Sequence, residues 1–206
     1  MDRKLEDYLK HIIIPTYRNY DKGHDEAHVL KVIANSMEIA KDYNVNQEMV
    51  YVIAAFHDLG MPFGRKEHHL SSAILAYYDH VLNEHFTPEQ LLIIKEAIED
   101  HRASNTAEPR SLYGKIIAEA DRDLDVDTIL YRTWQYGLTH NPHLDEKEQY
   151  TRCYNHLVEK YGEGGYLKLY LETEKNKAGL DSLRSLLKDP AALKERFETV
   201  IKQNKK

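Results

Sequence analysis

The chain has 206 residues, of which 42% are hydrophobic and 30% are charged, and its formal net charge at pH 7 is −6. This length fits one domain with a continuous core, and the composition excludes both a disordered chain and a membrane protein. The acidic balance argues against an extended nucleic-acid-binding face, because such faces carry excess basic charge. Cys153 is the single cysteine, which excludes an internal disulfide and a cysteine-rich zinc site.

The start of the sequence carries no sign of export or membrane insertion. Residues 1–14 mix charges of both signs with a short apolar run, which is too short for a signal-peptide core or a membrane span. We therefore expect a cytoplasmic protein. Its acidic balance also means that a small anionic partner needs a local positive charge, and a bound cation is the obvious source.

Helical periodicity recurs along the chain, and no stretch alternates apolar and polar residues long enough to predict a strand. Residues 25–43 place an apolar stripe on one face, with His28 at its flank. Residues 47–59 are apolar almost all round, so this helix is expected to be central and to end at Gly60 in a left-handed conformation. Further helices are expected over 66–83, from Thr87 to near His101, over 111–123, over 126–137, and from Asp145 to about Tyr161. The sequence thus predicts an all-α, single compact bundle over residues 1–206, with helical extensions at both ends.

A buried His-Asp pair is the most informative local feature. His57 and Asp58 follow the apolar run 52–56, so the expected central helix carries a carboxylate into the core. Burying an unpaired carboxylate is costly unless a cation compensates its charge. A divalent metal provides that charge, and so does a salt bridge from Arg102 or Arg122. The pair by itself leaves both interpretations open.

The order of the surrounding ligand-type residues resembles the HD superfamily of metal-dependent phosphohydrolases. A histidine at position 28, the His57-Asp58 pair and a distant aspartate late in a helix follow the pattern that names the family. Residues 23–29, 119–122, 130–137 and 156–160 are also similar to segments of its small bacterial members, so the likeness covers about residues 20–170. The resemblance implies an HD domain whose metal ligands are His28, His57, Asp58 and Asp121.

The resemblance also implies one or two bound cations. His68 and His101 are similar to the third and fourth histidines of two-metal members, in which Asp58 would be the bridge. His69 takes the place of His68 if its helix is rotated, and the alternative for these histidines is phosphate contact or a helix surface. Imidazole and carboxylate ligands together suit manganese, iron, cobalt, nickel or zinc, and magnesium stays compatible.

Candidate groups for substrate binding and proton transfer lie near these positions. His24 lies one helical turn before His28, so we predict that it faces the substrate and takes part in catalysis with Asp58. Glu67 is predicted to orient the attacking water. Arg65, Lys66 and Arg102 are predicted phosphate-binding residues, and their alternative is a solvated surface.

The expected activity is hydrolysis of a phosphate ester or phosphoanhydride of a nucleotide, or of another small phosphorylated metabolite, by metal-activated water. Two alternatives stay open: a mixed-valent di-iron oxygenase of the same superfamily, and a catalytically idle, metal-bound ligand sensor. Relatives that hydrolyse guanosine tetraphosphate carry a Glu-Asp pair where this chain has Met61 and Pro62, which disfavours that activity. The segment after His101 likewise lacks the motif of the cyclic-dinucleotide group.

Overall fold

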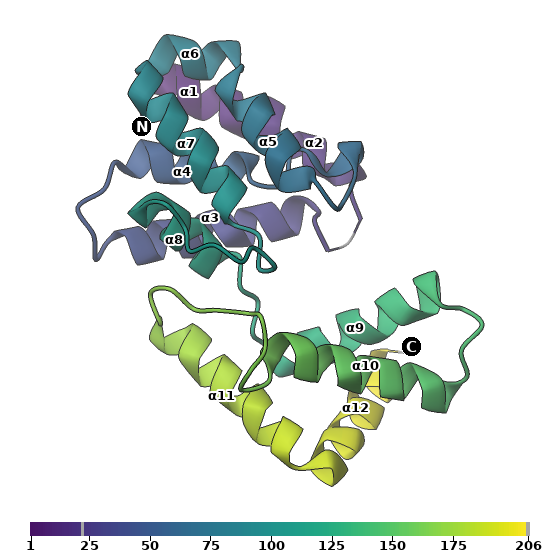
Figure 1. The fold of residues 1–206 in the computed structure, drawn as a ribbon. Coiled ribbons are helices and arrows are strands. Elements are labelled where there is room, and N and C mark those ends of the chain that lie inside the picture. Colours follow the sequence, from purple (N-terminus) through teal and green to yellow (C-terminus); the bar gives the residue numbers. More distant parts are fainter. Residues whose placement is uncertain (22, 205–206) are drawn as a thin grey trace. The chain divides into compact units, whose positions relative to one another are not determined.

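The computed structural model describes residues 1–21 and 23–204, and in these residues the chain is helical and contains no strand (Figure 1). The all-α prediction is therefore confirmed. None of the helices in these ranges is long and apolar enough to cross a bilayer. The chain divides into two compact units, Met1–Asp121 and Arg122–Lys206. A single domain over residues 1–206 stays a prediction, and each unit is described below by itself.

In the described residues, the first unit combines an N-terminal segment of short helical turns with six further α-helices and one 3₁₀ turn. The N-terminal segment runs from α1 (Arg3–Tyr8) through the π-helical turn η1 (Leu9–Ile13) and α2 (Ile14–Thr16) to the 3₁₀ turn η2 (Tyr17–Asn19). The later elements are α3 (Glu26–Ala40), α4 (Gln47–Phe56), the 3₁₀ turn η3 (Met61–Phe63), α5 (His68–Tyr77), α6 (His80–His85), α7 (Pro88–Asp100) and α8 (Leu112–Ala120).

Helix α4 lies at the centre of this unit, as its sequence predicts. It packs against α3, α5, α7 and α8, and the side chains of Val52, Ile53 and Phe56 are at most 1% exposed. Burying a side chain of this size stabilises a fold by about 1.5–3 kcal/mol. The helices around α4 begin at capped positions: the Asp25 carboxylate accepts from the His28 amide, and Thr87 forms a capping box with Gln90. The core thus fixes α4, and its carboxyl end carries the His-Asp pair.

The single helix expected over 66–83 is wrong, because the structure has two helices there. α5 ends at Tyr77 and α6 begins at His80. The side chain of Asp79 accepts hydrogen bonds from the backbone amides of Val81 and Leu82, both at 3.0 Å. An aspartate that satisfies these amides favours a new helix start over continuation of the preceding helix.

The expected left-handed conformation of Gly60 is also wrong. Its φ is −80°, so it does not end α4 in a left-handed conformation. The glycine is required by close approach instead, because a Cβ atom there would lie 2.5 Å from the Ser72 amide nitrogen and 2.6 Å from the His68 carbonyl oxygen. The turn after α4 therefore packs directly against the first turns of α5.

We expect Gly60→Ala to lower the free energy of unfolding by about 1–3 kcal/mol, because the added methyl group overpacks a contact between two backbones. Urea unfolding measures this change. Gly164→Ala is the matched control, since an added Cβ there meets nothing within 4 Å. Equal stability of the two variants would contradict the close-approach interpretation.

The second unit has its own apolar core. Its helices are α9 (Val126–His140), α10 (Glu146–Tyr161), α11 (Glu174–Lys188) and α12 (Pro190–Asn204). α9 packs against α10 and α12, and α11 packs against α10 and α12 (Figure 1). Cys153 is 1% exposed among apolar neighbours, so its thiol is part of this core. The tail past Gly165, whose sequence pattern is mixed, thus contributes two helices to this core.

Candidate metal centre

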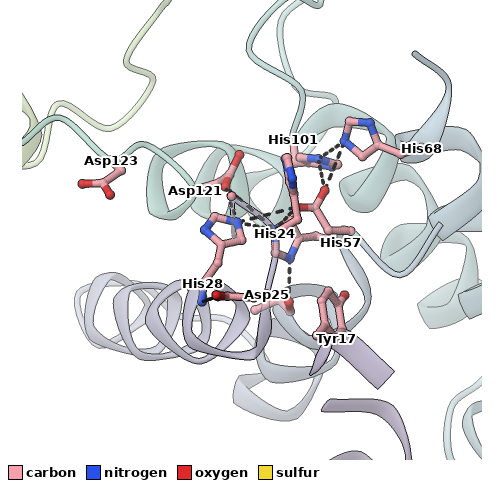
Figure 2. A network of polar contacts seen from close by, with 12 residues as sticks. Tyr17, His24, Asp25, His28, His57, His68, His101, Asp121 and Asp123 are labelled. Carbon is pink, nitrogen blue, oxygen red and sulfur yellow. Dashed lines mark hydrogen bonds and ion pairs between the residues drawn. The ribbon is translucent and has the colours of Figure 1, made fainter. Parts of the chain in front are cut away.

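Six ligand-type side chains of the first unit converge at helix ends (Figure 2). Each comes from the first turn of a helix or from the residues that follow one, where the chain changes direction. The positions are His28 in the first turn of α3, His57 at the C-cap of α4 with Asp58 next to it, His68 at the start of α5, His101 at the C-cap of α7 and Asp121 at the C-cap of α8.

Four of these residues form the first half of the cluster. The Nε2 atoms of His28 and His57 are 3.3 Å apart. Oδ2 of Asp58 lies 3.5 Å from the former and 3.2 Å from the latter. Oδ1 of Asp121 lies 3.2 Å from Nε2 of His28 and 3.8 Å from that of His57. Ligands bound at about 2.0–2.2 Å to one cation stand roughly 2.8–3.6 Å apart, so nearly all of these spacings suit a shared metal.

The other oxygen of Asp58 faces a second group. Oδ1 lies 3.1 Å from Nε2 of His68 and 3.4 Å from Nε2 of His101. These two nitrogens are themselves 3.1 Å apart. The Asp58 carboxylate thus joins two triads, each with the donor types and spacing of a metal site.

The backbone sets the tautomer that three of the histidine rings adopt when they are neutral. Each ring places Nδ1 against the carbonyl oxygen three residues earlier, and because a carbonyl can only accept, Nδ1 carries the proton. The neutral ring then presents the lone pair of Nε2 to the cluster, which is the orientation that metal-bound histidines use. The distances are 2.8 Å for His57 to Ala54, 2.7 Å for His68 to Arg65 and 2.6 Å for His101 to Ile98.

This tautomer tests whether the residues fit a cation. With both Nδ1 atoms donating to carbonyls, the facing Nε2 atoms of His68 and His101 are two acceptors, and two acceptors cannot form a hydrogen bond with each other. A positive charge between them and Asp58 resolves the conflict. The donor set of this second group therefore fits a metal ion.

The electrostatics of the first group also favour positive charge. Burial raises the pKa of the Asp58 carboxyl, but the surrounding histidines, foremost His57, outweigh burial and hold that pKa well below its usual range. The pKa of Asp121 is lowered as well, because a hydrogen bond from His28 outweighs its burial. Burial lowers the pKa of His28, yet its bonds to Asp121 and Asp58 prevail and raise that pKa to about 10. Both carboxylates are therefore ionised in a buried site.

His24, a predicted catalytic residue, lies beside both groups. Its ring centroid is 5.9 Å from that of His28 and 6.5 Å from that of His68. Its Nδ1 is 2.9 Å from Oδ1 of Asp21, and burial lowers the pKa of His24. Asp21 was not predicted, although its spacing of three residues from His24 is a signal that could have identified it.

The structure brings His68, not His69, to the cluster. His69 is 9% exposed, and its Nδ1 has no hydrogen-bond partner among the described residues. Burial lowers the pKa of His69 to about 4, with further lowering from the neighbouring His101 and Arg102. His69 thus lines the cluster from outside as a neutral ring.

The predicted phosphate-binding residues lie around the start of α5. The Arg102 guanidinium donates to the carbonyl oxygen of Lys66, and Nη1 of Arg65 is 3.8 Å from Oδ2 of Asp21. Arg65 and Lys66 are exposed, as is Glu67, whose side chain makes no capping hydrogen bond at the start of α5. The structure thus joins Arg102 to Lys66 across 36 positions of sequence. It leaves the predicted role of Glu67 a prediction.

Two polar residues that support the ligands were not predicted. Asn35 on α3 donates from Nδ2 to the carbonyl oxygen of Ala120, directly before Asp121, at 3.1 Å. Ser72 accepts from the Gly60 amide at 2.8 Å. Both bonds hold backbone within two residues of a candidate ligand, and no local sequence pattern indicates either of them.

Comparison with known proteins agrees with this geometry. The HD domain family model matches residues 26–124, a span that contains all six side chains of the cluster. The chain is 25% identical to a predicted HD superfamily hydrolase of known crystal structure from an uncultured Thermotogales bacterium, with a TM-score of 0.50 over 76% of this chain and 87% of that one. No curated protein matches the chain. Residues 26–124 thus form an HD domain.

Proposed function

We propose that the protein is a metal-dependent phosphohydrolase that cleaves a phosphate ester or phosphoanhydride of a nucleotide or another small phosphorylated metabolite. The observation that carries this proposal is the buried carboxylate of Asp58, whose two oxygens face two separate histidine pairs. Histidine and carboxylate ligands together suit manganese, iron, cobalt, nickel or zinc. A substrate of this class is a small anion, and on a chain of net charge −6 a bound cation would supply the local positive charge that such a substrate needs.

In this proposal the cluster holds up to two cations. His28, His57, Asp58 and Asp121 would hold the first, and His68 and His101 would share Asp58 to hold the second. A divalent cation bound here lowers the pKa of a water molecule and offsets negative charge on a phosphate oxygen. The hydrogen bonds from Nδ1 to backbone carbonyls keep the three rings oriented, so little reorganisation is needed when substrate binds.

His24 is the proposed proton-transfer group. Asp21 engages its Nδ1 at 2.9 Å, which leaves Nε2 as the acceptor on the other side of the ring. Burial lowers the pKa of His24, so the ring is neutral at pH 7 and ready to accept a proton from an attacking water. The same ring can return that proton to the leaving oxygen.

Lys66 and Arg102 are the proposed phosphate-binding pair. We expect Lys66→Ala and Arg102→Ala each to lower kcat/KM by roughly 10-fold, because a charge-assisted hydrogen bond contributes about 1.5–3 kcal/mol. Metal content is expected to stay at the wild-type level. Lys41→Ala removes an exposed lysine paired with Glu38 and serves as the control. Unchanged kinetics in both variants would contradict phosphate binding and would favour a solvated-surface role for Lys66 and Arg102.

Metal analysis of the purified full chain, followed by assays on phosphomonoesters, nucleoside triphosphates and cyclic nucleotides, tests the proposal. We expect bound transition metal and phosphate release from at least one class, with both lost on chelation. Metal without turnover on any phosphate compound would favour the catalytically idle sensor.

The paired triads also favour one second candidate, a mixed-valent di-iron oxygenase. Two triads that share one carboxylate would suit oxygen chemistry as well as phosphate hydrolysis, because they would hold two metal ions close together. Iron content and oxygen consumption separate the two functions. An iron-loaded protein that consumes oxygen and releases no phosphate would replace the phosphohydrolase proposal.

A further inference from the structure

The turn after α4 carries two candidate ligands in a buried stretch of chain. His57 is 0% exposed and Asp58 is 3% exposed. Backbone carbonyls in such a turn need hydrogen-bond donors, because burial limits their access to water. Part of this need is met locally: the amide of Leu59 donates to Phe56 and the amide of Met61 donates to Asp58, both at 3.0 Å.

Two other carbonyls of this stretch accept hydrogen bonds from tyrosines of the N-terminal segment. The Tyr17 hydroxyl donates to the carbonyl oxygen of Ala55 at 2.9 Å, and the Tyr20 hydroxyl donates to that of Leu59 at 2.8 Å. The two rings pack with centroids 5.0 Å apart. Tyr17 is fully buried, and burial raises its pKa well above the usual 10.0, so the phenol stays protonated and able to donate.

These bonds act on the backbone that orients the ligands. His57 donates from Nδ1 to the carbonyl of Ala54, and Tyr17 holds the next carbonyl along the chain. Tyr20 holds the carbonyl that follows Asp58. The two phenols thus act on either side of the His-Asp pair, and Figure 2 draws Tyr17 within this polar network.

We infer that Tyr17 and Tyr20 are positioning residues for His57 and Asp58, and that the segment preceding α3 is part of the metal centre. This inference rests on the proposed metal-binding function. It extends the centre beyond residues 26–124, the span that the HD family model matches. Outer residues that orient metal ligands typically change metal affinity by about 10–100-fold when they are removed.

Cobalt titration of the metal-free full chain tests the inference without any assay of turnover. Co²⁺ reports both its affinity and, through its visible absorption bands, the geometry of its ligands. We expect Tyr17→Phe to weaken Co²⁺ binding by about 10-fold and to shift those bands, because the phenol is lost while the ring stays in place. Tyr20→Phe is expected to act in the same direction with a smaller effect, since Tyr20 is less buried than Tyr17.

Tyr8→Phe is the matched control. Tyr8 belongs to the same N-terminal segment and its hydroxyl also donates across the fold, to Asp79 at the start of α6. This hydrogen bond involves no residue of the cluster. Tyr8→Phe should therefore bind Co²⁺ with wild-type affinity and spectrum, even where it lowers the unfolding temperature.

The outcomes separate this inference from the function on which it rests. A wild-type chain that fails to bind Co²⁺ would remove the metal-centre proposal itself. A wild-type chain that binds, together with a Tyr17→Phe variant of equal affinity and spectrum, would overturn the positioning role alone. An equal loss of Co²⁺ affinity in Tyr8→Phe would also overturn the positioning role, because the loss would then result from lower stability of the fold. If circular dichroism shows that Tyr17→Phe does not fold, the same criteria apply to Tyr20→Phe.

Discussion

Replacing Asp58 with alanine is expected to remove both cations and to reduce turnover by at least about a thousandfold. Each oxygen of this carboxylate contacts a different pair of histidines, at 3.1–3.5 Å. The substitution therefore takes one ligand from each half of the cluster at once. It also removes a buried negative charge, so the facing histidines can remain neutral and the helical fold can persist.

Elemental analysis, circular dichroism and a phosphate-release assay measure these effects together. Helical content should stay near the wild-type value while metal and activity are lost. Asp42→Ala is the control, because Asp42 is an exposed acidic residue just after α3 and lies outside the cluster. An Asp58→Ala variant with full metal content and full activity would show that the cation binds elsewhere.

The position of a helix in the fold was predictable where the composition of that helix alone indicates that it is buried. The apolar run over 47–59 identified the central helix α4 because nearly every side chain of that run is apolar, whatever packs around it. The predictions were wrong where the local structure depends on contacts with other segments or on a single capping residue. Gly60 is explained by its approach to α5, and the break after Tyr77 depends on one capping aspartate within a sequence that otherwise favours helix.

The division of the chain shows a similar limit. The boundary between the two units falls between Asp121 and Arg122, without a glycine- or proline-rich linker to mark it. A short connection directly after a helix C-cap leaves no compositional signal. Composition therefore cannot separate one unit from two in this chain.

The candidate ligands were predictable to a greater extent than the residues that support them. The order of histidines and aspartates is a property of the sequence, and the structure brings neighbouring ligand atoms of this cluster within 3.1–3.8 Å of each other. The supporting bonds instead join residues that are distant in sequence. Tyr17 reaches Ala55 across 38 positions, and Asn35 reaches Ala120 across 85. Such bonds follow from tertiary packing, which no local pattern encodes.

Replacing His101 with alanine is expected to lower the metal content from two ions per chain to one. His101 contacts Oδ1 of Asp58 at 3.4 Å and Nε2 of His68 at 3.1 Å, so its loss leaves the second group with a single imidazole and a shared carboxylate. The first group keeps His28, His57 and Asp121 together with Oδ2 of Asp58. The first ion should therefore stay bound.

Elemental analysis at saturating metal and anomalous scattering from crystals measure this stoichiometry. His69→Ala is the matched control, because His69 is a buried histidine next to His68 that stays outside both triads, and it should retain two ions. One ion in the wild-type chain at saturation would exclude the two-metal site. The lone pairs of His68 and His101 would then need a different source of positive charge, namely a shared proton held beside the ionised Asp58, and the two rings would be assigned to substrate phosphate or to core packing.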